Sequence, residues 1–146
     1  MFKCGAGKYP AMTNVLNSLQ SDKVKLFSLE DCYFVAKCVE VYDGDTITVI
    51  ICMDFGDEAN SRFFKFKVRL YGINTPEIRT KDKKEKQLGY EARDYLRSLV
   101  LGELIYLKCG KFDKYGRLLG VVFTLESHEN INEKMLEKGY AIPYLV

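Results

Sequence analysis

The sequence has little net charge and no long apolar run. Its 146 residues include 22 Lys and Arg against 20 Asp and Glu, which leaves a formal charge of +2. Overall charge therefore does not indicate a nucleic-acid-binding protein, and any electrostatic attraction has to be local. The first twenty residues lack the apolar stretch of a secretory signal, and no other stretch is long enough to span a bilayer. We therefore expect an intracellular protein without a membrane segment.

The chain also lacks the cysteine pattern of a disulfide-rich or zinc-binding domain. Its five cysteines are odd in number and include no C-x-x-C pair, so we expect buried free thiols. Hydrophobic residues make up 47% of the chain and charged residues 29%, which excludes a disordered protein. A chain of this length can bury one substantial core, so one domain suffices.

What is present is a series of short β-like runs after a different N-terminal part. Residues 1–31 are interpreted as an extension, partly helical or irregular, with a short helix near 12–19, ahead of one domain at 32–146. In the run before Tyr71, apolar and basic residues alternate, which places Arg69 on the solvent side of a sheet. Runs rich in β-branched and aromatic residues predict five strands, at 33–42, 46–52, 63–71, 104–109 and 118–125.

Helical patterns occur in the C-terminal half. Apolar residues recur at spacings of three and four from Leu88 to Leu99, which predicts an amphipathic helix over 86–100 that ends before Gly102. Asn130 is suited to cap a terminal helix. Strands and helices in this order predict an α+β fold dominated by a small barrel.

The first of three polar motifs is D-G-D-T at 43–46. Two carboxylates two positions apart suit a hard cation, but an EF-hand is excluded because the sixth position from Asp43 is Thr48 rather than glycine. Taken alone, the motif is better explained by an ordinary Asp-Gly hairpin turn.

The second motif is R-L-Y-G-I-N-T-P-E at 69–77. Pro76 forces Thr75 into an extended conformation, so Glu77 follows a stiffened segment at the end of a strand. A glutamate held there can act as a general base, and a polar turn is the alternative.

The third motif is F-D-K-Y-G-R at 112–117. Asp113 and Gly116 predict a hairpin turn, but turn chemistry does not explain why arginine follows at 117. Arginine offers a planar, permanently charged fork that suits phosphate oxygens better than lysine does.

Together, in this order and at these separations, the three motifs resemble those of the staphylococcal nuclease family over roughly residues 33–144. The resemblance implies a five-stranded OB-like β-barrel with two or three packed helices and an active site at one side of the barrel. It also implies a calcium-dependent phosphodiester hydrolase, an endonuclease with little sequence specificity that cuts single-stranded DNA or RNA more readily than duplex. We expect it to be a monomer.

The resemblance assigns the metal ligands residue by residue. The family's calcium ligands correspond to the side chains of Asp45 and Asn74 and to the backbone carbonyl of Thr75. The best-known member of the family has aspartate where this chain has Asn74, so the site loses one negative charge and should bind the cation more weakly. Magnesium and manganese are alternatives to calcium.

The resemblance likewise assigns the catalytic and substrate-binding residues. Glu77 corresponds to the base that activates or positions water. Arg69 and Arg117 correspond to the groups that bind the scissile phosphate and offset the charge of its transition state. Lys114 and Tyr115 correspond to contacts with a terminal phosphate.

Other interpretations stay open. A catalytically weakened OB-like module that binds nucleic acid or a protein is supported by Asn74, whereas the retained acidic and basic motif residues favour the enzyme. The basic residues between Arg62 and Lys86 suit a solvated loop, a phosphate-facing patch, or docking to an acidic partner or membrane surface.

Three further expectations concern the periphery. The chain stops soon after its last predicted helix, so we expect the family's further C-terminal helix to be missing and residues 1–31 to cover the core instead. His128 is expected in a surface loop. Tyr140 and Tyr144 are suited either to stack on bases or to pack against helix ends.

Overall fold

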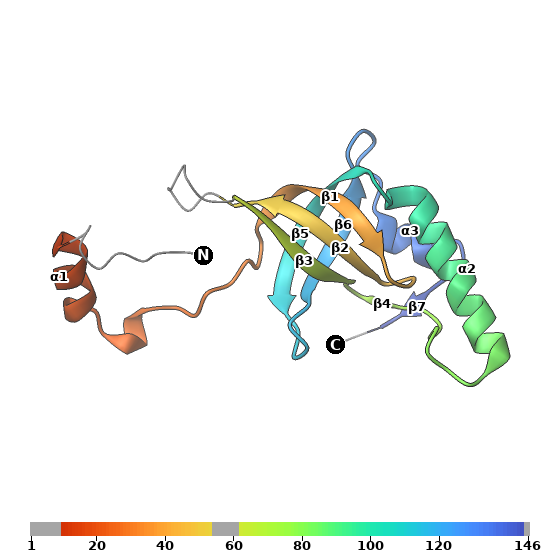
Figure 1. The fold of residues 1–146 in the computed structure, drawn as a ribbon, viewed down its shortest axis with the longest axis horizontal. Helices are drawn as coiled ribbons and strands as arrows, with labels where there is room; N and C mark the ends of the chain where they lie inside the picture. The colour runs from red at the N-terminus through yellow and green to blue at the C-terminus, as the bar shows by residue number, and fades with distance from the viewer. Residues whose placement is uncertain (1–9, 54–61, 145–146) are drawn as a thin grey trace.

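The computed structural model describes residues 10–53 and 62–144, in which five strands close into a barrel (Figure 1). The strands occur around the barrel in the order β1-β2-β3-β6-β5, and all neighbours are antiparallel except the parallel pair β3 and β6. This confirms the predicted α+β barrel. Their bounds are Tyr33–Val41 for β1, Thr46–Cys52 for β2, Phe63–Leu70 for β3, Leu104–Phe112 for β5 and Leu118–Thr124 for β6.

The strands match the five predicted runs closely, and the largest difference is in β5. This strand continues past Cys109 to Phe112 through an irregularity in its pairing with β6. The inward side chains of the barrel, such as Val49, Val68 and Leu107, are completely buried. A period-two pattern predicts such strands well because one face has to be apolar.

Two helices cover one side of the barrel (Figure 1). α2 (Lys83–Val100) begins before its predicted start because the Asp82 carboxylate caps it, accepting hydrogen bonds from the Lys84 and Glu85 backbone N–H groups at 2.9 and 3.3 Å. α3 (Ile131–Glu137) begins after Asn130 as predicted, with the Asn130 side chain accepting from the Glu133 N–H at 3.1 Å.

Two short strands were not predicted. β4 (Ile73–Asn74) pairs antiparallel with β7 (Ile142–Pro143), near the C-terminal end of the described chain. Two residues are too few to show a period, so this pair has no sequence pattern of its own. It ties the segment that carries Asn74 to the chain after α3.

The N-terminal segment lies apart from the barrel. α1 (Pro10–Ser18) and the short 3-10 helix η1 (Ser21–Lys23) extend away from it in Figure 1. Among residues 12–31, Leu29 alone is buried. The expectation that this segment covers the core is therefore wrong for these residues, since the extended stretch before Leu29 leads away from the barrel. The domain division at residue 32 stays a prediction.

The cysteines follow the expectation in part. Cys38 and Cys109 are buried, and burial raises the pKa of each thiol to about 11. Cys32 is half-buried, Cys52 is exposed, and Cys4 lies outside the described residues. Within the described part of the chain, no helix combines the length and the apolar character that crossing a membrane requires.

Candidate active site

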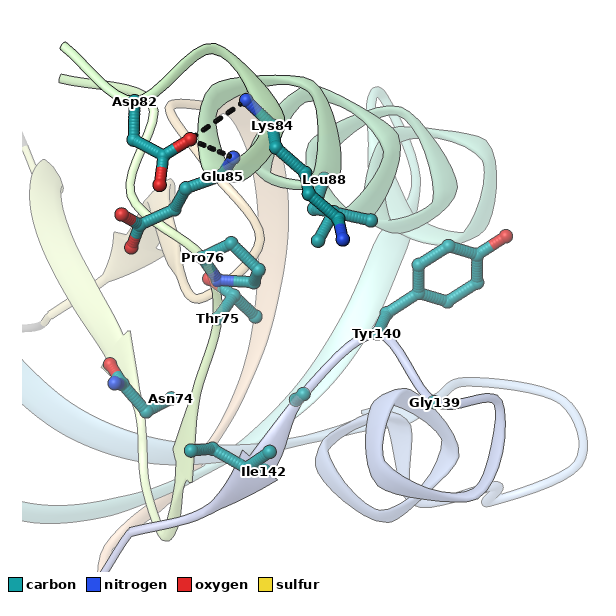
Figure 2. Close-up of a pocket in the computed structure, with 11 residues that line it drawn as sticks. Asn74, Thr75, Pro76, Asp82, Lys84, Glu85, Leu88, Gly139, Tyr140 and Ile142 are labelled. Atoms are coloured by element: carbon teal, nitrogen blue, oxygen red, sulfur yellow. Dashed lines mark hydrogen bonds between the residues drawn. The ribbon is translucent and has the colours of Figure 1, made fainter. Parts of the chain in front are cut away.

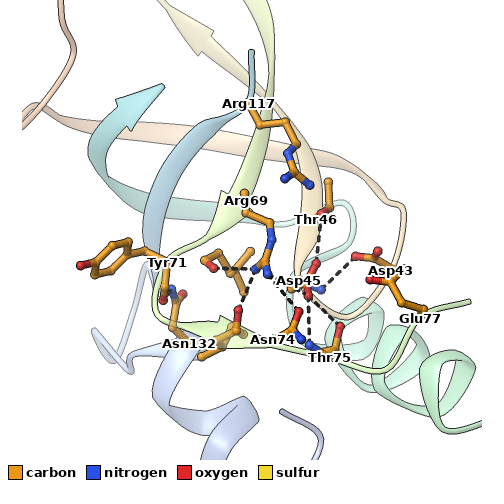
Figure 3. A network of polar contacts seen from close by, with 12 residues as sticks. Asp43, Asp45, Thr46, Arg69, Tyr71, Asn74, Thr75, Glu77, Arg117 and Asn132 are labelled. Carbon is orange, nitrogen blue, oxygen red and sulfur yellow. Dashed lines mark hydrogen bonds and ion pairs between the residues drawn. The ribbon is translucent and has the colours of Figure 1, made fainter. Parts of the chain in front are cut away.

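A groove of about 550 Å³ brings together the polar motifs that the sequence separates. It is lined by Asp45 after the β1–β2 turn, Arg69 at the end of β3, Asn74 in β4, Glu77 beyond it, and Arg117 before β6 (Figure 3). The first and last of these residues are 72 positions apart in the chain. A hydrolytic centre requires its carboxylates and guanidinium groups to lie around one site, and the groove brings them together in this way.

The D-G-D turn packs closely against α2 and Thr75. The Asp43 carboxylate accepts a hydrogen bond from the Asp45 backbone N–H at 3.0 Å, which closes the turn. A Cβ atom at Gly44 would lie 2.8 Å from both Ala92 Cβ in α2 and Thr75 Cγ2. Only glycine allows this approach, which buries the Asp45 side chain at the edge of the groove.

Four groups hold the Asp45 carboxylate. Its Oδ2 atom accepts hydrogen bonds from the backbone N–H and the hydroxyl of Thr75, both at 3.0 Å, and its Oδ1 atom accepts from the Thr46 hydroxyl at 3.2 Å. Arg69 Nη2 lies 3.4 Å from Oδ2. The carboxylate is therefore fixed in orientation, which lowers the entropic cost of binding a further ligand.

The predicted place of Arg69 on a solvent-side ridge is wrong. Lys65 and Lys67 are exposed as predicted, but the Arg69 side chain is only 12% exposed because it turns into the groove. Its Nη1 atom donates to the Leu70 and Ile73 carbonyls at 2.9 and 2.8 Å. These carbonyls lie in the turn where β3 ends, and a guanidinium group can satisfy both.

Arg69 also binds the side chain of β4. Its Nη2 atom donates to Asn74 Oδ1 at 3.2 Å, beside its ion pair with Asp45 (Figure 3). None of the described residues accepts a hydrogen bond from its Nε–H. The guanidinium is thus held by several acceptors and keeps one donor for a ligand.

Arg117 is held by the hairpin turn before it. Asp113 accepts from the Arg117 Nε–H at 2.8 Å and from its backbone N–H at 2.9 Å. Burial pushes the pKa of Asp113 upward, but the hydrogen bonds from Arg117 and from the Tyr115 N–H outweigh it and leave the pKa below its usual value. Figure 3 shows the Arg117 guanidinium pointing toward Arg69 and Thr46.

Three carboxylates, those of Asp43, Asp45 and Glu77, lie close together at one side of the groove. Burial, and after it the nearby charges of Asp45 and Glu77, raise the pKa of Asp43 to about 7, against a hydrogen bond from the Asp45 N–H that lowers it. Glu77 is exposed, and its backbone N–H donates to Glu85 Oε1 at 3.4 Å, which links it to α2. The D-G-D motif suggested Asp43 as one of two carboxylates for a cation, but the resemblance assigned Asp43 no role.

The donors at this side suit a hard divalent cation. They are oxygen atoms of Asp43, Asp45 and Asn74. A cation would also offset the negative charges of Asp45 and Glu77, which together with burial raise the pKa of Asp43. Among the residues described, no three His, Cys, Asp or Glu side chains form a ready cluster for a metal. A cation would therefore be held by few carboxylates together with neutral oxygens and water.

Lys114 and Tyr115 do not line the groove but flank it on the β5–β6 turn. Tyr115 is 72% exposed, and its ring centroid lies 5.4 Å from Arg117 Cζ and 5.1 Å from Lys114 Nζ. They are therefore next to Arg117 and open to solvent. Their predicted contact with a terminal phosphate stays a prediction.

The structure supports helix packing for one of the two peripheral tyrosines, and base stacking stays a prediction. Tyr140 stacks on Tyr95 in α2, with ring centroids 4.5 Å apart, and so packs between the helices. Tyr144 is half-exposed, and Arg69 Cζ lies 5.9 Å from its ring. His128 is exposed in the loop before α3, as predicted, and its ring centroid lies 5.0 Å from that of Tyr106, on which it stacks.

Asn132 is a positioning residue that sequence reasoning missed. It is 4% exposed, and its amide N–H groups donate to the Tyr71 and Gly120 carbonyls at 2.9 and 3.0 Å. Its Oδ1 atom accepts from the Val122 N–H at 3.1 Å. It therefore fastens the chain after β3, and with it Arg69, to β6. A polar residue beside the apolar Ile131 was the only signal.

A second pocket, of about 450 Å³, lies between α2 and β7 (Figure 2). Asn74 lines both this pocket and the groove, and Leu88, Tyr140 and Ile142 supply apolar surface. Neither arginine of the motifs reaches it. The candidate active site is therefore the groove in Figure 3.

The fold and the groove together define an OB-like barrel domain with a charged site at one side. The family model described as staphylococcal nuclease homologue matches residues 67–146. The chain belongs to this family, and the resemblance seen in the motifs is confirmed.

Several curated proteins are similar to the chain. An uncharacterized protein from Methanocaldococcus jannaschii is 30% identical over 135 residues, which cover 77% of this chain and 60% of that protein. A probable endonuclease from Yarrowia lipolytica is 33% identical over 79 residues, 53% of this chain and 35% of that protein. The endonuclease YhcR from Bacillus subtilis is 35% identical over 88 residues, 55% of this chain and 7% of that protein. The chain thus spans 60% or less of the length of these relatives.

Proposed function

We propose that this domain is a divalent-cation-dependent nuclease that hydrolyses phosphodiester bonds in nucleic acid, with calcium as its cation. The observation that carries the proposal is one groove with two held guanidinium groups facing a set of carboxylates. Phosphodiester hydrolysis needs donors for a growing negative charge, a group that takes a proton from water, and an electrophile at the phosphoryl oxygens. Family membership and relatives named endonucleases support the same reaction.

The two arginines are assigned to the scissile phosphate. Arg117 uses its Nε–H on Asp113, which leaves both Nη groups for phosphate oxygens. Arg69 is held by carbonyls and can offer its Nε–H. Because both guanidinium groups are already oriented, little reorganisation is needed as charge develops in the transition state.

Glu77 is assigned as the general base. Its carboxylate lines the groove and is exposed, so a water molecule can reach it. It would hold the proton released as water attacks phosphorus. The link between its backbone and Glu85 limits how far the residue can move.

The cation would be held by Asp45, Asn74 and the Thr75 carbonyl, with Asp43 close by. When bound, it would act as a Lewis acid on a phosphoryl oxygen. The Asn74 oxygen already accepts a hydrogen bond from Arg69, and it carries no full charge. Both features favour weaker cation binding than an aspartate would give.

We further propose little base specificity, a preference for single strands, and a monomeric enzyme. The assigned contacts go to phosphate, and phosphate contacts carry no direct sequence information. Lys114 and Tyr115 would add a contact to a terminal phosphate beside Arg117.

The test uses purified protein and single-stranded DNA, with calcium or with chelator, and a Glu77→Gln variant. We expect calcium-dependent cleavage that falls by about 10²–10⁴-fold in the variant. Glu91→Gln, an exposed change on α2, is the matched control and should cleave normally. Asn74→Asp should lower the calcium concentration for half activity. Binding without cleavage at any calcium concentration would instead identify a nucleic-acid-binding module.

A further inference from the structure

Another groove, distinct from the pocket in Figure 2, adjoins the candidate active site. This side groove is lined by Tyr42, Ile78, Arg79, Thr80, Lys81, Lys86 and Tyr90. Tyr42 and Arg79 line both the side groove and the candidate active site. The two hollows therefore adjoin and share a wall.

The side groove is positively charged and its cations are not neutralised by the protein. Its lining contains Arg79, Lys81 and Lys86 and, as far as the described residues go, no carboxylate. Within the described ranges none of these three forms an ion pair, whereas Arg93 nearby is paired with Asp94 at 3.0 Å. Unpaired cations in a concave surface attract repeated negative charge.

Aromatic rings accompany these cations. The Arg79 guanidinium lies 5.7 Å from the centroid of the Tyr42 ring, which keeps the guanidinium oriented. Lys86 and Tyr90 are four residues apart in α2 and so lie on the same face of the helix. Among the described residues of the lining, Ile78 is the only aliphatic one, so a lipid chain or an amphipathic helix would find little aliphatic surface there.

We propose that the side groove binds the substrate strand beyond the scissile phosphate, so that the enzyme holds several nucleotides of single-stranded nucleic acid. This inference rests on the proposed nuclease function. Arg79, Lys81 and Lys86 contact successive phosphates. Tyr42 and Tyr90 each have a guanidinium over one ring face, from Arg79 and Arg93, and would offer the other face to unpaired bases. Duplex cannot present its bases to these rings, so the side groove also favours single strands.

The test compares a Lys81→Ala/Lys86→Ala variant with wild type on two substrates, a thymidine dinucleotide and a 20-nucleotide single strand. The control is Lys37→Ala/Lys138→Ala, which removes the same charge from exposed residues outside both grooves. Binding of the 20-mer is also measured in chelator over a range of salt concentrations. Anionic vesicles containing phosphatidylserine serve as the rival ligand.

We expect KM for the 20-mer to rise at least about tenfold in the variant, while KM for the dinucleotide stays unchanged. The slope of log affinity against log salt should become shallower by about 1.4, at about 0.7 for each lost phosphate contact. Equal behaviour of variant and control on the 20-mer would overturn the inference. Loss of vesicle binding with intact 20-mer binding would overturn it too.

Failure of the proposed function gives a different result. Wild type would then cleave neither the dinucleotide nor the 20-mer, whatever the side groove does. The binding arm still decides the inference in that case: weaker 20-mer binding by the variant alone supports the side groove, and unchanged binding rejects it.

Discussion

Removing the Thr75 hydroxyl should reduce both stability and cation binding. The hydroxyl donates to Asp45 Oδ2 at 3.0 Å, and the two residues are 4% and 6% exposed. A buried hydrogen bond to a charged group contributes about 1.5–3 kcal/mol. Thr75→Val keeps the shape and the β-branched backbone preference, so this loss should be nearly the whole effect.

We therefore expect Thr75→Val to lower the free energy of unfolding by about 1.5–3 kcal/mol, and Tm by about 3–12 °C for a chain of this size. The measurement is guanidinium and thermal unfolding in chelator, so that no cation contributes. In calcium titrations the variant should need more calcium for half-maximal cleavage, because the Asp45 carboxylate is less firmly oriented.

Thr48→Val is the matched control. Thr48 lines the same groove, and no described residue forms a hydrogen bond with its hydroxyl. Its unfolding free energy should change by no more than about 0.5 kcal/mol. If Thr75→Val and Thr48→Val are equally stable, the hydrogen bond to Asp45 does not have the role assigned to it.

Three further changes test the groove. Gly44→Ala should cost about 1–3 kcal/mol by overpacking, since the new Cβ meets Ala92 Cβ at 2.8 Å, and adding Ala92→Gly should restore part of it in thermal unfolding. With a folded-state pKa of about 7 against an ordinary 3.8, Asp43 retains a proton that the unfolded chain releases. The metal-free protein should therefore lose stability as pH rises from about 4 to about 7, and a curve that Asp43→Asn does not flatten would contradict this. Asn132→Ala removes the partner of the Val122 N–H and of the Tyr71 carbonyl, while the Gly120 carbonyl still accepts from the Tyr71 N–H at 2.8 Å, so unfolding should show a loss of about 2 kcal/mol or more, and a smaller loss would mean that water replaces the amide.

Much of the fold follows from local patterns. The alternation before Tyr71 and the three-and-four spacing around Leu96 predicted a strand and a helix that the structure confirms. The Asn130 cap did the same for α3. Such patterns are reliable because they depend on backbone geometry and on which face meets the core, both of which operate over a few residues. The three motifs also sufficed to identify the family.

The arrangement of the site required the tertiary structure. Thr75 binds Asp45 across thirty positions, and Arg69 turns inward because carbonyls at the end of β3 accept its N–H groups. The raised pKa of Asp43 and the wall shared by the two grooves depend likewise on barrel closure. Sequence alone determined which residue types and turns are available. Only the closed barrel decided which of them meet, because charges and hydrogen bonds act over a few ångströms in space whatever their distance along the chain.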